Sequence, residues 1–430
     1  MRFDTPDPRR SNPHTRQDQI IKIQLARKLG LGTSGRHAFV GAFGGYALDS
    51  YDYQVLPLGL VAIAASLRIS TGEAGLLTTV TLVLSAVGGV VAGILIDRIG
   101  RVRTLLFTII TYAVFTVLCG FAPNFESLLV LRALQGLGFG GEWAAGAILV
   151  AEYCSPRYRG RTVGFIQSSW AVGWALSVVV ATAVFSLASP QIAWRLLFWT
   201  GALPALLVFY LRRQVTDAPI VVQQAEPGQH RGSFGAIFGR HLGRTTFFAA
   251  LLTTGVQGGY YTLFGWLPSY LTTQRHLTVV GTEGYLMLLI SGAFVGYITG
   301  SYLTDLLGRK LTIALFATLS AVLIFLYTHV PTGANTIVLI LGFPLGWCTS
   351  AIFSGFGSFL AELYPTAQRG TGQGFTYNVG RALGAVFPTL VGFLAGSWGL
   401  GGAMVLGALA YGLAALALLG LPETRGRDLL

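Results

Sequence analysis

Most of the chain consists of long runs of hydrophobic residues, and the charged residues are concentrated in the short stretches between them. Each run is close to the ~20 apolar residues that a helix needs to cross the hydrocarbon core of a bilayer. By that standard there are about twelve runs, at residues 38–66, 74–96, 104–121, 126–150, 162–187, 194–211, 245–271, 284–304, 311–329, 335–360, 372–396 and 401–421. The long alternation of apolar and polar residues that is typical of membrane barrels is missing. The pattern predicts an all-α membrane protein with twelve transmembrane helices.

Composition agrees with this prediction and changes the meaning of the net charge. Hydrophobic residues make up 53% of the chain and charged residues 11%, against about 25% charged residues in an average soluble domain. In a soluble chain, a net charge of +12 would suggest a nucleic-acid partner. Here 24 of the 29 Lys and Arg residues lie in the two tails and in the alternate loops that begin after the second span. The positive-inside rule then predicts that both termini are cytoplasmic, and we expect no nucleic-acid partner.

Sequence signatures of enzymes, metal sites and nucleotide binding are missing. There is no GxxxxGK[ST] loop to cradle a phosphate, which argues against ATP-driven transport. None of the 6 histidines pairs with a cysteine or an acid at metal-ligand spacing. The tail at residues 1–36 has no apolar core followed by a cleavage site, so we expect no removable signal peptide. The sequence predicts a protein that is not an enzyme and that holds no metal or cofactor.

The chain contains an internal repeat. Residues 151–165 (AEYCSPRYRGRTVGF) align without gaps to residues 361–375 (AELYPTAQRGTGQGF), and residues 93–102 (GILIDRIGRV) resemble residues 300–310 (GSYLTDLLGRK) at nearly the same offset. Such a repeat predicts two homologous six-helix halves. The expected segments are a cytoplasmic arm at 1–36, a first bundle at 37–212, a cytoplasmic linker at 213–244, a second bundle at 245–421 and a cytoplasmic tail at 422–430.

Two short motifs carry a family resemblance. The loop after the second span resembles the loop signature of the major facilitator superfamily, through Gly93, Asp97, Arg98, Gly100 and Arg101. The fourth span is similar to that superfamily's fourth-helix motif, through Arg132, Gln135, Gly136 and Gly138. The ending LPETRGRDL is similar to the close of the last helix in its sugar-transporter-like branches. The resemblance covers residues 37 to 430 and implies a secondary transporter that works by alternating access.

Further stretches narrow the resemblance to one branch. LDSYDY, GFGGEWAAGAILVAE, QSSWAVGWAL and AELYPTAQRGTGQGFTYNVGRALG are similar to the sialate and lactate proton symporters, with the aromatic-acid symporters as near neighbours. The sequence departs from these families at Ser50, where glycine or alanine is common, and at Gln54, where an apolar residue is expected. The resemblance implies proton-coupled transport of a carboxylate and leaves the substrate open.

Two aspartates lie inside the first predicted span. Asp49 and Asp52 lie roughly 16 to 21 Å from the start of this helix, near the middle of a ~30 Å core. Three residues apart, they are expected to share one helix face, where both cannot ionise cheaply. Ionisable groups at this depth are functional candidates by default. We predict that Asp52 carries the transported proton and that Asp49 assists it; a purely structural, hydrogen-bonding role is the alternative.

Arg381 is a cation at similar depth in the eleventh predicted span. Because arginine stays charged, it needs either an aspartate from the facing half or an anionic substrate. In the families that the chain resembles, an arginine at this place in NxGR faces the central cavity. We expect Arg381 to bind a substrate carboxylate, with Asn378 one turn earlier on the same face; a structural ion pair is the alternative.

Other polar residues inside spans are weaker candidates. Glu142 lies in the fourth span and is a second candidate on the proton path, and about 15 Å of helix separates it from Arg132. Further candidates for the cavity wall and the substrate site are Gln167, Gln257, Tyr260 and Tyr261. Lone polar residues in membrane helices more often join helices than bind ligands, which is the alternative for each of them.

Acids and arginines recur at the cytoplasmic ends of the spans in both halves. Asp97 and Asp305 precede Gly-Arg turns, and Glu152 and Glu362 precede Arg-Gly turns. Ion pairs between them can hold the halves together and break when the cytoplasmic side opens; capping of the local helix ends is the alternative. The complete set predicted to control opening and closing is Gly93, Asp97, Arg98, Gly100, Arg101, Arg132, Glu152, Arg159, Asp305, Arg309, Glu362 and Arg369.

These observations predict a proton-coupled symporter of the inner membrane that takes up a small organic anion, such as a monocarboxylate, a sugar acid or an aromatic acid. Its partners would be the substrate, H⁺ and the lipid bilayer; its energy source would be the proton gradient; and the chain is expected to act as a monomer. Two alternatives stay open: a proton-coupled exporter or drug antiporter, and a non-transporting membrane sensor on the same scaffold.

Overall fold

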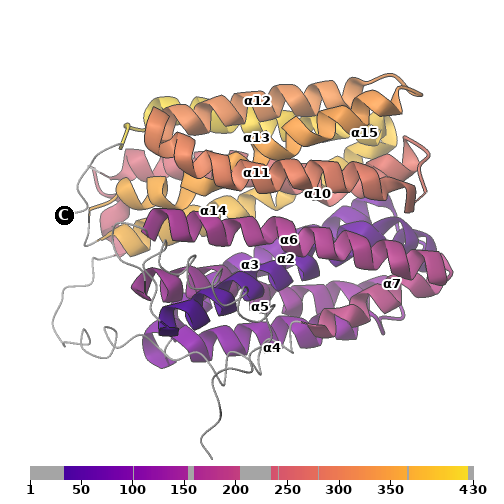
Figure 1. Cartoon of the computed structure of the whole chain (residues 1–430), viewed down its shortest axis with the longest axis horizontal. Coiled ribbons are helices and arrows are strands. Elements are labelled where there is room, and N and C mark those ends of the chain that lie inside the picture. The colour runs from indigo at the N-terminus through magenta and orange to yellow at the C-terminus, as the bar shows by residue number, and fades with distance from the viewer. Residues whose placement is uncertain are drawn as a thin grey trace, which may run out of the picture.

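A computed structural model describes residues 33–99, 101–153, 159–203, 234–240, 242–278, 280–365 and 368–424, and these residues form helices and short connections (Figure 1). Residues 1–32 of the predicted N-terminal arm, most of the predicted linker, Cys154 and Gly100 lie outside the described residues. Within some helices only the backbone is described, which applies to the side chains of Asp97, Arg98, Arg101, Glu142, Glu152 and Arg159. The segment boundaries predicted from the repeat stay predictions.

Helices from the first and second parts of the chain gather on opposite sides of the molecule, with their long axes roughly aligned (Figure 1). The first group is α2 (Thr33–Leu67), α3 (Thr71–Ile99), α4 (Arg101–Cys119), α5 (Phe125–Tyr153), α6 (Arg159–Leu187) and α7 (Pro190–Trp199). The second group is α10 (Gly243–Thr273), α11 (Glu283–Leu307), α12 (Arg309–His329), α13 (Asn335–Glu362), α14 (Arg369–Gly384) and α15 (Val386–Ala417). The single-turn 3₁₀ helices are η1 (Thr200–Ala202), η2 (Phe234–Phe238), η3 (Val280–Thr282) and η5 (Leu418–Gly420).

The prediction of membrane-spanning helices is confirmed in part. By length and hydropathy, 6 stretches of the described chain can cross a bilayer, in α3, α6, α11, α12, α13 and the continuous α14 to α15 stretch. Helices α2 and α10, which are 35 and 31 residues long, are not among these stretches. Their polar residues lower the mean hydropathy, and in α2 these include the buried Asp49, Ser50, Asp52 and Gln54.

The last two predicted spans are divided in the structure by Gly399. This residue has φ 70 and ψ 161 inside α15, which is non-helical and lies in the left-handed region that favours glycine. The predicted span at 372–396 therefore corresponds to α14 together with the part of α15 before Gly399. The predicted span at 401–421 begins after this kink.

Helices pack most closely where glycine faces a neighbouring backbone. A Cβ on Gly140 of α5 would lie 1.8 Å from the Ser85 carbonyl oxygen of α3, and one on Gly173 of α6 would lie 1.7 Å from the Ala47 carbonyl oxygen of α2. Between the two groups, α6 packs against α11, α3 packs against α14 and α15, and α2 packs against α10. Small residues allow membrane helices to approach in this way.

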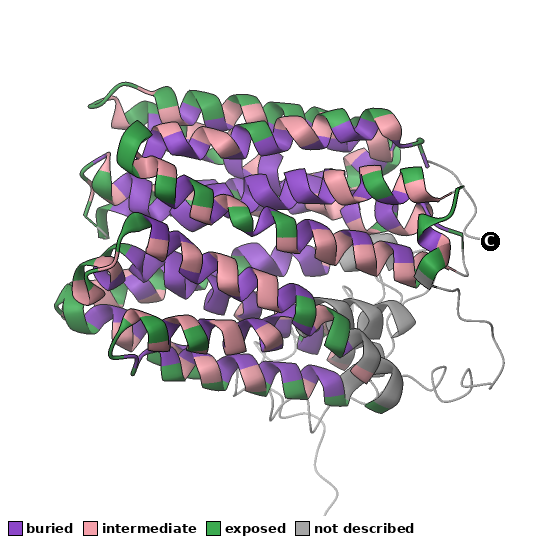
Figure 2. Ribbon diagram, turned by 180° about the vertical axis from the view of Figure 1, so that it is seen from behind, coloured by how far each residue is buried: buried purple, intermediate pink, exposed green. Residues whose placement is uncertain are grey.

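The buried residues concentrate between the helices, and the outer faces are exposed (Figure 2). Many of the exposed side chains are large and apolar, including Leu306, Phe393 and Leu419 at 66%, 69% and 76% exposure. This much exposed apolar surface is unfavourable in water and is favourable in contact with lipid tails. The helices are therefore solvated by lipid on the outside and keep their polar groups inside.

Candidate functional site

A small central cavity lies between the two groups of helices. Its lining residues are Tyr46, Asp49, Tyr53, Phe139, Trp170, Tyr260, Tyr261, Tyr297, Phe353, Tyr377 and Arg381. They come from α2, α5 and α6 of the first group and from α10, α11, α13 and α14 of the second. Nine of these eleven residues are aromatic, and the other two carry opposite charges. The cavity volume is about 40 Å³, which is room for only a few water molecules.

Arg381 is the cation of the central cavity and is 6% exposed. Its Nη2 donates a long hydrogen bond of 3.4 Å to Tyr377 Oη, and its guanidinium lies 5.1 Å from the Tyr377 ring centroid. Its Nε has no hydrogen-bond partner among the described residues. A buried guanidinium is costly unless its donors are used, so Arg381 is suited to accept an anion from outside the chain.

The backbone of α14 brings Arg381 to this position because the helix carries glycines where it meets α10. A Cβ on Gly380 would lie 2.3 Å from Thr253 Cβ, and one on Gly384 would lie 2.8 Å from the backbone nitrogen of Gly258. Where the two helices meet, Thr253 Oγ1 of α10 donates a hydrogen bond of 2.9 Å to the Thr376 carbonyl oxygen of α14. Larger residues at these glycines would push α14, and the arginine with it, away from α10.

Asp49 is the anion of the central cavity and is 2% exposed. Tyr46 and Tyr53, one turn before and after it on α2, line the same cavity. The ring centroids of Tyr46 and Trp170 are 5.0 Å apart, and those of Tyr53 and Phe139 are 5.8 Å apart. Tyr53 also lies 6.3 Å from the ring of Tyr261 on α10, which joins the two groups of helices through aromatic contact.

Asp52 lies in a different environment, inside the first group of helices, and it is not among the residues that line the cavity. Its Oδ2 accepts a hydrogen bond from Gln135 Nε2, and Gln135 Oε1 accepts one from Arg132 Nη1. Gln135 Nε2 also contacts Thr116 Oγ1 at 2.7 Å. We call these four buried residues the Asp52 network. Asp52 Oδ1 has no hydrogen-bond partner among the described residues.

The structure therefore separates two aspartates that were expected to share a face. Three residues advance an α-helix by about 300°, so the second side chain points about 60° away from the first. In α2 this difference is enough to direct Asp49 to the cavity and Asp52 to α5. Arg132, which was grouped with the residues at the helix ends, lies beside Gln135 in the Asp52 network and is 1% exposed.

The remaining predicted substrate residues occupy several positions. Tyr260 and Tyr261 line the cavity, and Gln257 lies behind them, accepting a bond of 2.8 Å from Tyr261 Oη and donating one of 3.0 Å to the Tyr377 carbonyl oxygen. Asn378 donates to the Gly374 carbonyl oxygen at 2.9 Å and is not among the lining residues. Gln167 is buried on α6 and is also not among them.

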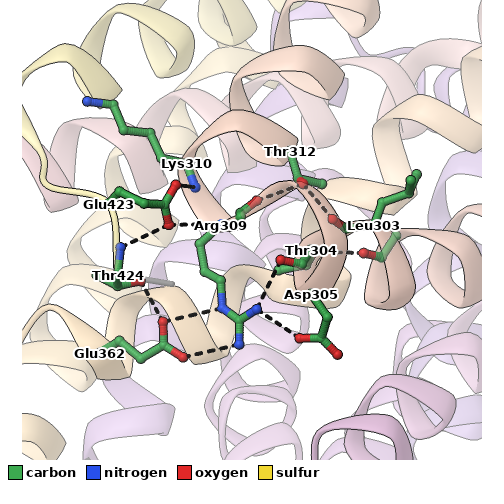
Figure 3. Close-up of polar contacts among 11 residues, drawn as sticks. Leu303, Thr304, Asp305, Arg309, Lys310, Thr312, Glu362, Glu423 and Thr424 are labelled. Atoms are coloured by element: carbon green, nitrogen blue, oxygen red, sulfur yellow. Dashed lines mark hydrogen bonds and ion pairs between the residues drawn. The ribbon is translucent and has the colours of Figure 1, made fainter. Parts of the chain in front are cut away.

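A cluster of charges lies at the junction of α11, α12 and α13 (Figure 3). Arg309 Nη1 pairs with Asp305 Oδ1 at 2.8 Å, and Arg309 Nε lies 3.4 Å from Glu362 Oε2. Thr424 Oγ1 donates to Glu362 Oε2 at 2.5 Å. Glu423 accepts bonds from the backbone N–H groups of Arg309 and Lys310, at 3.0 and 3.1 Å, which satisfies free donors at the start of α12.

This cluster joins three residues predicted to control opening, Asp305, Arg309 and Glu362, and it adds two that the sequence analysis did not select, Glu423 and Thr424. All five belong to the second part of the chain, so these contacts stay within one group of helices and do not hold the two halves together as predicted. Arg369 begins α14. In the first group of helices, Gly93 lies near the end of α3, and the charged residues of the corresponding positions are described by their backbone only.

The aromatic wall was also missed, apart from Tyr260 and Tyr261. A signal was present, since Tyr46 and Tyr53 flank the two acids in YALDSYDY and Tyr377 precedes NVGR. An aromatic residue in an apolar run does not indicate by itself whether it faces lipid, a neighbouring helix or a cavity.

Comparison with known proteins agrees with this architecture. The family model described as Major Facilitator Superfamily matches residues 42–301 and 291–429. The chain is 40% identical to a probable 4-methylmuconolactone transporter of Cupriavidus pinatubonensis over 392 residues, covering 91% of each chain. It is 32% identical to a cis,cis-muconate transport protein of Acinetobacter baylyi, covering 87% of this chain and 91% of that protein. The crystal structure of a D-xylose-proton symporter has a TM-score of 0.75 at 17% identity, covering 91% of this chain and 99% of that one, which concerns the fold alone.

Proposed function

The chain belongs to the major facilitator superfamily, and from that membership we propose that it is a secondary transporter that takes up a small organic anion together with a proton. It is a multi-pass membrane protein and not an enzyme. We further propose that it lies in the inner membrane with both termini in the cytoplasm, because the Lys and Arg residues are concentrated in the tails and in alternate loops.

The observation that carries the proposal is that Arg381 is buried in the cavity wall and that its Nε has no hydrogen-bond partner among the described residues. A buried guanidinium with an unused Nε, in a cavity with aromatic walls, is suited to a carboxylate that brings its own apolar body. The names of the two relatives, a transporter for 4-methylmuconolactone and one for cis,cis-muconate, support an organic acid as substrate. The cavity is smaller than such an acid, so the lining side chains have to move apart on binding, as alternating access provides.

Proton coupling is proposed from the two aspartates. An anion on Arg381 adds negative charge beside Asp49 in a site of low dielectric constant, and a proton on Asp52 or Asp49 lowers the total negative charge on α2. Asp52 stays our first candidate for the proton carrier because it lies away from the substrate cavity, in a network that ends at Arg132. The loaded transporter, carrying both substrate and proton, would be the form that reorients.

Opening and closing are proposed to involve the cluster around Arg309. Its ion pairs with Asp305 and Glu362 and the bond from Thr424 to Glu362 join α11, α12, α13 and the segment after α15 (Figure 3). Exchange of such contacts is a known way for packed helices to switch between two arrangements. The repeated motif in the first half is expected to act in the same way.

The experiment that tests this function records external pH around energy-depleted, weakly buffered cells that express the protein. Aromatic and aliphatic carboxylates, neutral sugars and cationic drugs are added in turn. Alkalinisation with a carboxylate, lost in Asp52→Asn, is the expected result. Acidification on adding a cation would instead establish antiport and overturn the proposal, and a pH that does not respond to any carboxylate would also contradict it.

A further inference from the structure

Besides Arg381 Nε, two hydrogen-bond donors of the central cavity lack a partner among the described residues. Tyr53 Oη and Trp170 Nε1 are buried atoms without a hydrogen bond among the described residues, and both side chains line the cavity. The residues are 3% and 8% exposed, and their ring centroids are 5.9 Å apart. Leaving a buried donor unsatisfied is unfavourable, so each donor favours a ligand that supplies an acceptor atom.

The charges of the cavity limit what that acceptor can be. Arg381 is the one cation among the described lining residues, and it is the partner expected for the carboxylate of the substrate. A second carboxylate on the same molecule would find no further cation in this wall and would be repelled by Asp49. The acceptor that satisfies Tyr53 and Trp170 is therefore neutral, such as a carbonyl or ester oxygen or a ring nitrogen.

The shape of the cavity adds a third condition. Its walls are rings from both groups of helices, including Tyr53 of the first group and Tyr261 and Phe353 of the second. Aromatic faces stack favourably on flat π-systems. The lining therefore favours a flat, unsaturated ring.

We propose that Tyr53 and Trp170 form a second polar subsite that binds a neutral acceptor atom of the substrate, and that Asp49 excludes a second carboxylate. The transporter then selects flat ring acids that carry one carboxylate and one neutral acceptor. This inference rests on the proposed function, because it takes Arg381 as the site of the first carboxylate.

Three ligands of similar size test separately the preference for a neutral acceptor and the exclusion of a second carboxylate. These are 4-acetylbenzoate, 4-isopropenylbenzoate, which replaces the carbonyl oxygen with a CH₂ group, and terephthalate, which replaces the acetyl group with a second carboxylate. Binding of each is measured by titration calorimetry on the purified full-length protein in lipid nanodiscs at neutral pH. We expect 4-acetylbenzoate to bind about tenfold more tightly than each of the other two.

Variants of the donors test the subsite. Tyr53→Phe and Trp170→Phe should each reduce the preference for 4-acetylbenzoate over 4-isopropenylbenzoate by about threefold to tenfold, with the affinity for 4-isopropenylbenzoate retained. Retained binding shows that the variant is folded. The matched control is Tyr411→Phe, a buried tyrosine of α15 whose Oη also lacks a hydrogen-bond partner and which is not a lining residue; it should leave the preference unchanged.

Asp49→Asn tests the exclusion of a second charge. It should raise the affinity for terephthalate relative to 4-acetylbenzoate by about tenfold, whereas Glu126→Gln, which removes an exposed acid at the start of α5, should not. If Arg381→Gln abolishes binding while the Tyr53, Trp170 and Asp49 variants leave the ratios unchanged, this inference fails and the proposed function stands. If Arg381→Gln leaves all three affinities intact, the proposed function fails as well.

Discussion

Asp49 and Asp52 are separated by one turn of α2 and lie in two very different regions of the molecule. Asp49 lines an aromatic cavity between the two groups of helices, opposite a buried arginine from the second group. Asp52 is enclosed within the first group and is bonded to Gln135, which is bonded to Arg132. Asp49 faces the cavity that we propose as the substrate site, and Asp52 is shielded from that cavity. In the proposed mechanism, α2 would connect substrate binding to proton binding while keeping the two ligands apart.

The largest effect is expected on the cavity side, where Arg381→Gln should weaken substrate binding. Hydrogen bonds to charged groups contribute about 1.5–3 kcal/mol each, so losing the guanidinium should reduce substrate affinity on the order of a hundredfold. Titration of the purified protein with the transported acid measures this effect. Arg195→Gln changes an arginine that binds the Gly120 and Ala122 carbonyl oxygens away from the cavity and serves as the control. Equal losses in both variants would show that Arg381 has no special part in binding.

On the other side, Asp52→Asn should separate proton coupling from transport. Asparagine keeps an acceptor for Gln135 but cannot release a proton, so accumulation against a gradient should fall by about tenfold or more, while exchange of labelled for unlabelled substrate continues. Uptake and exchange in proteoliposomes with an imposed pH gradient measure the two activities. Accumulation that survives in Asp52→Asn would exclude Asp52 as the proton carrier and leave Asp49 as the candidate.

The two regions can also be compared by how much a buried glutamine in each contributes to the stability of the folded protein. Gln135→Leu removes the amide between Asp52 and Arg132 and leaves both charged groups without that partner. An unsatisfied buried polar group costs about 1–3 kcal/mol, so we expect a clear fall in the melting temperature in detergent. Gln257→Leu is the comparable change on the cavity side, where neutral partners are lost, and should lower the melting temperature by less. The reverse order would contradict the expectation that an amide with charged partners is the more costly one to remove.

The smallest effect is expected for Tyr261→Phe. The hydroxyl group donates one neutral hydrogen bond of 2.8 Å to Gln257, and one such bond contributes about 1 kcal/mol. Because this bond only positions the Tyr261 ring in the cavity wall, substrate affinity should fall by no more than about fivefold, with the ratio of protons to substrate unchanged. Parallel binding and coupling measurements on the same preparation test both statements, and an altered ratio would mean that the two regions are not separate.

The sequence predicted the helices and the two charged groups of the cavity because both depend on local information. A long apolar run becomes a membrane helix wherever it lies in the chain, and a charge inside such a run has to face the interior. The roles assigned to Asp49, Asp52 and Arg381 stay predictions that the experiments above can test.

The rest depends on how the helices pack against one another. Gln135 reaches Asp52 only because α5 lies beside α2, and the sequence separation of 83 residues gives no indication of this contact. The rings of Tyr53 and Tyr261 meet only because α2 lies beside α10. The sequence shows that a polar or aromatic side chain inside a span needs a partner. Only the packing of the helices shows which residue that partner is.

The small volume of the central cavity has an electrical consequence. A membrane that stores energy as a proton gradient has to remain an insulator, and a transporter with a water-filled centre would let ions run back through it. In this conformation the middle of the described helices is filled by aromatic rings, with about 40 Å³ left between them. In the proposed mechanism a proton crosses only on a side chain and only with each turnover of the protein, so the proton gradient would be used only when substrate moves.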